Sequence, residues 1–154
     1  MGSADKANPS RVVWLGREHE RERARLLNEL GPPSFRSQPR WTAGAIINDS
    51  LHGLVEIADC DDPQVWIAWL VVEPRWRRCG LGTALLASAV SWAETCSDRH
   101  TLRLIFTRHH WPMRRLAMKA HARLDLVLEE LWADIRLRAP SSNGISISNG
   151  EHHD

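Results

Sequence analysis

The chain has 154 residues, of which 43% are hydrophobic and 25% charged, which is the balance of one ordinary globular domain. The net charge is only +1, so no basic excess indicates a nucleic-acid partner, and Cys60, Cys79 and Cys96 lack the spacing of a disulfide framework or a zinc site. No apolar run reaches the roughly 18 residues of a membrane span, and the first ten residues lack the apolar core of a signal peptide, so we expect a cytoplasmic protein with no metal and no membrane partner.

Both ends of the chain have a composition that cannot form a packed core. Residues 1–10 and 139–154 are polar, so we expect flexible tails on either side of a single domain at residues 11–138. The domain opens with a charged segment, residues 18–30, that is typical of a helix and ends at Gly31 before two prolines. Its alternating arginines and glutamates predict a face exposed to solvent.

Three segments rich in β-branched and aromatic residues follow, at residues 41–47, 51–58 and 65–73. Turn-forming clusters separate them, at residues 48–50 and 59–63. Because both connections are short, the three segments predict an antiparallel three-strand meander.

The hydrophobic spacing then changes from two residues to 3.6, which predicts a helix over residues 80–95. Residues 101–107 form the next predicted strand. After a helix of this length the strand should return parallel to the strand at 65–73 through a right-handed crossover. Pro112 suits the first turn of a further helix, whose apolar face we expect to extend to Leu124.

Two more strands are expected at the end of the domain. Alternating apolar residues at 131–137 predict a half-buried strand, with which residues 126–128 can pair. Together the segments predict an α/β domain, of the α+β kind, built on a mixed sheet.

The segment LVVEPRWRRCGLGTALL, residues 70–86, joins the end of a strand to the start of a helix through an arginine-rich turn. The first turn of a helix leaves N–H groups without partners and carries partial positive charge, so phosphate oxygens are stabilised there. Gly80 and Gly82 have no side chain to hold an anion away, and Arg77 and Arg78 supply charge-assisted donors. We favour pyrophosphate binding over the alternative that the glycines serve only a tight turn with close helix packing.

Two common phosphate-binding motifs are excluded. The dinucleotide fingerprint GxGxxG fails because residue 85 is Leu, and the P-loop motif fails because no Lys follows Gly82. The remaining pattern, RRCGLG at residues 77–82, resembles the RxxGxG motif of the GNAT superfamily of acetyl-CoA-dependent N-acetyltransferases. The order of predicted elements over about residues 11–138 is also similar to that family.

The resemblance implies both a fold and a cofactor. The GNAT-like fold would have a central mixed, mostly antiparallel sheet of about six to seven strands flanked by helices, with the parallel strands 65–73 and 101–107 splayed apart. Acetyl-CoA would enter the splay, and its pantetheine amides would hydrogen-bond to the main chain near Leu70, Val71 and Val72. Its pyrophosphate would contact the loop residues Arg77, Arg78, Cys79, Gly80, Leu81, Gly82 and Thr83.

By the same resemblance, the acetyl group would pass to a primary amine of a small molecule or peptide by direct attack, without a covalent enzyme intermediate. Homodimers are common in this superfamily. Attack requires a neutral amine and usually a base. The candidate bases are Glu56, in the strand beside the cofactor strand, and Glu73 at the end of the cofactor strand; we favour Glu56.

Two departures from the family pattern bear on catalysis. The chain has no tyrosine, and Ala117 stands where many relatives place the tyrosine that protonates the leaving thiolate. His110 replaces the usual asparagine before the last helix, where it could contact the cofactor or act as an acid. The alternative to an enzyme is therefore a catalytically weak acyl-CoA-binding domain that serves as a sensor or partner protein.

The acceptor side is defined less well by the sequence. Trp14, Trp41 and Trp111 are candidates for lining it, whereas Trp69 suits the core or the wall of the fold better than an acyl pocket. No charge pattern in the expected acceptor wall selects one class of amine over another.

Overall fold

The computed structural model describes residues 11–31, 38–77, 79–96 and 99–138. The strands are β1 (Arg11–Trp14), β2 (Trp41–Ile47), β3 (Ser50–Asp59), β4 (Val65–Val72), β5 (Thr101–Thr107), β6 (Arg123–Val127) and β7 (Glu130–Arg136). The α-helices are α2 (Glu20–Leu30), α3 (Leu81–Cys96) and α4 (Trp111–Lys119), and short 3-10 turns form η1 (Arg17–His19) and η2 (Pro74–Trp76). The tails expected at both ends lie outside the described residues.

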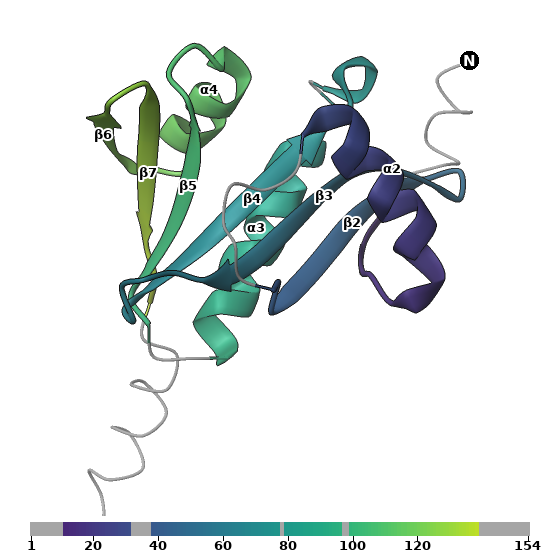
Figure 1. Ribbon diagram of the computed structural model, residues 1–154, viewed down its shortest axis with the longest axis horizontal. Coiled ribbons are helices and arrows are strands. Elements are labelled where there is room, and N and C mark those ends of the chain that lie inside the picture. Colours follow the sequence, from purple (N-terminus) through teal and green to yellow (C-terminus); the bar gives the residue numbers. More distant parts are fainter. Residues whose placement is uncertain (1–10, 32–37, 78, 97–98, 139–154) are drawn as a thin grey trace, which may run out of the picture.

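The seven strands form one sheet in the order β1-β2-β3-β4-β5-β7-β6 (Figure 1). All neighbours are antiparallel except β4 and β5, which run parallel. The expected mixed, mostly antiparallel sheet is therefore confirmed.

The predicted meander is formed by β2, β3 and β4. Its first hairpin turns at Asn48 and Asp49, whose φ angles of 53° and 68° are those of the left-handed turn that suits a twisted hairpin. The parallel pairing is also confirmed, because Val65 to Ala68 of β4 align with Thr101 to Leu104 of β5.

Three elements differ from the sequence-based expectation by two residues or more at one boundary, and one strand was not expected. The strand expected at residues 126–128 is β6, which begins at Arg123. The last helix, α4, ends at Lys119 instead of continuing to Leu124, because His121 takes a φ of 60° and the chain turns into β6. No glycine or proline lies within the few residues after Lys119 to mark this stop in the sequence. The strand β1 was not expected, since four residues are too few for an alternating pattern to show, and the first helix begins at Glu20, two residues late, after η1.

Helices cover both faces of the sheet. On one face α3 and α4 supply Leu85, Ala89 and Met113 to the main core. On the other face α2 places Leu26, which is completely buried, against Leu51 of β3. Figure 1 shows α2 in front of the β2–β3 half of the sheet and α3 behind it. Within the described ranges, no helix is both long enough and apolar enough to cross a bilayer.

Candidate active site

The parallel strands β4 and β5 separate over their C-terminal halves (Figure 1). Their pairing covers Val65 to Ala68 on β4 and stops there. Beyond that point β4 pairs only with β3 and β5 only with β7, so within the described ranges the backbone groups facing the gap have no strand partner. A cavity of about 650 Å³ lies in the gap. The splay implied by the family resemblance is therefore present.

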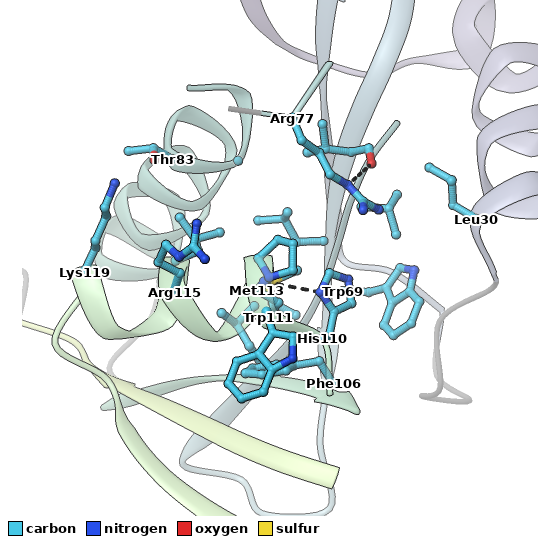
Figure 2. A pocket seen from close by; sticks show the side chains of 18 of the residues that line it. Leu30, Trp69, Arg77, Thr83, Phe106, His110, Trp111, Met113, Arg115 and Lys119 are labelled. Carbon is cyan, nitrogen blue, oxygen red and sulfur yellow. Dashed lines mark hydrogen bonds between the residues drawn. The ribbon is translucent and has the colours of Figure 1, made fainter. Parts of the chain in front are cut away.

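Most of the residues expected to bind the cofactor line this cavity (Figure 2). They are Leu70, Val71, Val72, Arg77, Gly80, Gly82, Thr83 and His110. Two expected residues are placed elsewhere: Cys79 is exposed outside the lining, and Leu81 is buried in the core. Arg78 lies outside the described residues.

The two glycines of the β4–α3 junction are not explained by close packing. Gly80 has a φ of +85°, and a Cβ built there would meet nothing within 4 Å. At Gly82 a Cβ would meet only Leu116, at 3.4 Å. The first intrahelical bond runs from the Ala84 N–H to the Gly80 carbonyl, at 3.0 Å, so the preceding amides of the first turn are left for another acceptor. The glycines thus keep open space beside first-turn amides that have no hydrogen-bond partner among the described residues, which favours the anion-binding interpretation.

Basic side chains line the cavity near this junction. Arg77 Nε donates to the Val72 carbonyl, 3.1 Å away, which holds the guanidinium over the end of β4. Arg115 and Lys119, one helical turn apart on α4, lie with Thr83 on the opposite side of the cavity (Figure 2). The wall around the junction is therefore positively charged and suits a ligand carrying phosphates.

The side chain of His110 caps α4 at the cavity wall. Its Nδ1 accepts from the Met113 N–H at 3.3 Å, so the neutral ring carries its proton on Nε2. Burial, and secondly the charge of Arg77, lower the pKa of His110, which keeps the ring neutral at neutral pH. An asparagine at this position would cap through its oxygen and donate through its amide, so histidine preserves both functions.

The preferred candidate base, Glu56, does not line the cavity. Its side chain is completely buried on β3, and Arg23 of α2 donates to its Oε2. Thr42 Oγ1 lies 3.4 Å from the same oxygen, and the other oxygen, Oε1, has no hydrogen-bond partner among the described residues. The Glu56 carboxylate is thus held by the guanidinium of Arg23, which reaches it from α2.

The second candidate base, Glu73, is also outside the cavity lining and fully engaged. Its Oε1 lies 2.6 Å from His52 Nδ1, and its Oε2 accepts from Arg25 at 2.9 Å. Burial alone would raise the pKa of Glu73, but the hydrogen bonds from His52 and Arg25 outweigh it and lower the pKa. Glu73 therefore links α2, β3 and the end of β4 as an ionised group.

The prediction that the charged side chains of residues 18–30 are exposed to solvent is wrong for two arginines. Arg23 and Arg25 point toward the sheet and hold Glu56 and Glu73. A charged residue that reaches inward by its long aliphatic stem gives no signal in hydrophobic periodicity, so the sequence did not reveal these pairs.

Aromatic residues complete the cavity. Trp69 lines it, and its Nε1 donates to the Gly31 carbonyl at 3.2 Å, which fixes the ring against the end of α2. Trp111, 58% exposed, lines its mouth, whereas Trp14 and Trp41 lie outside it. Ala117, at the place of the expected tyrosine, is completely buried in the core.

Residues 8–121 match the sequence model described as the Acetyltransferase (GNAT) family. No curated protein matches the chain significantly.

Several solved structures share the fold. An acetyltransferase of the GNAT family from Streptococcus pneumoniae is 16% identical with a TM-score of 0.71, over 84% of this chain and 100% of that one. Arabidopsis thaliana NAA60 in complex with acetyl-CoA is 12% identical with a TM-score of 0.68, over 83% and 98%. The ribosomal-protein-S18-alanine N-acetyltransferase from Escherichia coli is 13% identical with a TM-score of 0.63, over 84% and 93%.

Proposed function

Since this chain belongs to the GNAT family of acetyltransferases, we propose that it transfers the acetyl group of acetyl-CoA to a primary amine by direct attack. The observation that carries the proposal is the splay of β4 and β5 beside a glycine-lined helix start, whose first-turn amides have no partner among the described residues. Both features face one cavity of about 650 Å³. Among the neighbours in fold, NAA60 was solved with acetyl-CoA, which fits the same interpretation.

The residues present fit acetyl-CoA as the donor substrate. The Glu73 N–H bonds the His52 carbonyl of β3, so by strand alternation the Val71 main-chain groups also face β3, and those of Leu70 and Val72 face the gap. The free edge of β4 at Leu70 and Val72 therefore offers main-chain groups to the pantetheine amides, much as a neighbouring strand would. The first-turn amides around Gly80, Gly82 and Thr83 would hold the pyrophosphate. Arg77, Arg115 and Lys119 add charge-assisted donors around it.

The reaction needs only one group transfer. The lone pair of a neutral amine forms the new C–N bond to the acetyl carbon, and the C–S bond breaks to release the thiolate of coenzyme A. The amine then loses a proton, and the thiolate takes up one, so no net proton acceptor is consumed. Because a thiolate is a weakly basic leaving group, it can depart without the tyrosine that this chain lacks.

Of the three candidate catalytic residues, His110 is the one that lines the cavity, and as a neutral ring it supplies a hydrogen bond and not a proton. We propose that its Nε2–H donates toward the thioester or the departing sulfur, since Nδ1 is occupied by the cap of α4. Glu56 and Glu73 are weaker candidates for a catalytic role than His110, because each is paired with an arginine and neither lines the cavity.

The test is acetyl transfer by the purified protein. Free thiol is followed with acetyl-CoA alone and with acetyl-CoA plus a panel of primary amines, and we expect amine-dependent release. The Gly82→Asp variant should abolish release, because its carboxylate would repel the diphosphate, whereas an acidic residue in the first turn suits the helix itself. Ala87→Asp, which adds the same charge at an exposed position of α3, is the matched control and should retain activity.

The absence of tyrosine favours one alternative, a catalytically weak acyl-CoA-binding domain that acts as a sensor or partner protein. That function would bind acetyl-CoA at the same cavity and release no thiol with any amine. If the protein binds acetyl-CoA tightly, loses this binding in Gly82→Asp and acetylates none of the amines in the panel, the binding-domain function is supported and the enzyme function is contradicted.

A further inference from the structure

We propose that the acceptor is an amine carried on an apolar, aromatic body with a single positive charge, and that polyamines and lysine-rich peptides are excluded. This inference rests on the proposed acetyl transfer and concerns the part of the same cavity that faces away from the helix start. Three observations support the inference. The charged side chains that line the cavity are basic, Glu56 and Glu73 are paired with other side chains, and the tryptophans Trp69 and Trp111 line the cavity.

Every charged side chain that lines the cavity within the described ranges is basic. These are Arg77, Arg115 and Lys119, and His110 beside them is kept neutral. No aspartate or glutamate is among the described lining residues. A second ammonium group on the acceptor would therefore find no carboxylate counter-charge among the described lining residues.

The two carboxylates considered as bases, Glu56 on β3 and Glu73 just after β4, are already paired with basic side chains. Glu56 is completely buried and holds Arg23, and Glu73 is held by Arg25 and His52. A polyamine would have to displace these partners to gain an ion pair, and doing so would leave a charged group unpaired. These two carboxylates are thus not available to bind a dicationic acceptor.

Apart from Arg77, which lies above Trp69 and Leu30 in Figure 2, the surface left for the acceptor is apolar and aromatic. Figure 2 shows Arg115, Lys119 and Thr83 on one side of the cavity and Trp69 and Leu30 on the other. The ring of Trp69 is fixed by its bond to the Gly31 carbonyl, and Trp111 lies between the two sides at the mouth.

If the phosphates occupy the basic side, the acceptor meets this aromatic side. A fixed aromatic ring favours a flat apolar partner, because stacking costs little conformational entropy. One ammonium can also lie over an indole face before it loses its proton. A single amine on an aromatic body therefore fits better than an extended chain of charges.

The experiment compares 2-phenylethylamine with spermidine and with propylamine, in thiol release at saturating acetyl-CoA. We expect kcat/KM for phenylethylamine to exceed that for spermidine by about tenfold or more, with propylamine between them. The same order should hold for amine binding to the protein loaded with coenzyme A, measured by calorimetry, so the inference is tested even if turnover is slow.

Variants distinguish a specific role of the two tryptophans in amine preference from a general loss of activity. Trp69→Ala should lower kcat/KM for phenylethylamine about tenfold and leave propylamine nearly unchanged, while Trp69→Phe should retain most of the preference. Trp111→Glu places a carboxylate at the mouth and should shift the preference toward spermidine. Trp14→Glu, at another exposed tryptophan outside the cavity, is its control.

The two levels of proposal fail differently. A protein that transfers acetyl groups but prefers spermidine, or shows no preference among the three amines, would overturn this inference and leave the proposed function intact. A protein that does not bind coenzyme A would overturn the proposed function, and the inference with it.

Discussion

Glu56 of β3 and Arg23 of α2 form an ion pair across the helix–sheet interface, in which Arg23 Nε donates to a carboxylate that is completely buried. Arg23 also bonds Glu20 on its own helix at 3.1 Å. The burial of Glu56 therefore depends on α2 staying docked, and the pair connects the first helix to the strand next to the cofactor strand.

Removal of this arginine should destabilise the fold. Arg23→Ala leaves the Glu56 charge buried without a partner, and we expect a loss of about 3 kcal/mol in the free energy of unfolding, measured by urea denaturation. Arg21→Ala, exposed on the same helix, should change it by less than about 0.5 kcal/mol. The double variant Arg23→Ala with Glu56→Gln should recover most of the loss. A stable Arg23→Ala single variant would contradict the assignment of this pair.

Glu56→Gln tests whether this carboxylate acts as the base. Because Glu56 is paired and does not line the cavity, we expect kcat/KM of acetyl transfer to fall by less than about threefold, whereas loss of a general base costs about 10²- to 10⁴-fold. A loss in the larger range, with a pH–rate profile that loses its acidic limb, would return Glu56 to the catalytic role that the sequence first favoured.

The fold could be predicted in most of its elements, and for identifiable reasons. The meander is marked by turn residues at 48–50, and the change of hydrophobic spacing after residue 80 marks α3. The end of α4 could not be predicted, because the left-handed His121 carries no glycine signal. The strand β1 is held by pairing with β2 and has too little pattern of its own.

His110 should be replaceable by asparagine but not by alanine. His110→Asn keeps an acceptor for the Met113 N–H and a donor toward the cavity, so we expect near wild-type stability and turnover. His110→Ala removes the cap of α4, which should lower the free energy of unfolding by about 1 kcal/mol. It also removes the hydrogen-bond donor toward the cavity, which should lower kcat about tenfold or more. Equal turnover of the two variants would remove the proposed hydrogen bond from His110 to the thioester or sulfur while leaving its capping role.

The pH dependence of stability should report Glu73. Its pKa in the folded chain is lowered below the ordinary value of 4.5, so the unfolded chain takes up the proton first as the pH falls. Its contribution is present above pH 4.5 and is lost as the pH falls through the lowered folded value. Glu73→Gln should show a shallower acid loss of unfolding free energy than the wild type, followed by urea titration at several pH values. Parallel curves would contradict the ionised link.

The candidate site was only partly visible in the sequence. The loop motif RRCGLG pointed to the proposed anion site, because glycines and arginines at a strand–helix junction act locally along the chain. The pairing of Glu56 and Glu73 with arginines from α2 depends on how a distant helix docks, which no local pattern records. The same holds for Trp69, whose place in the cavity wall follows from the point where β4 and β5 part.

Calorimetric titration with coenzyme A tests the central claim most directly, because the whole account depends on the amides at the start of α3 binding its diphosphate. We predict measurable heat with the wild-type protein, binding at least about tenfold weaker in Gly82→Asp, and unchanged binding in Ala87→Asp. No heat with the wild type, or equal affinity in Gly82→Asp, would contradict it.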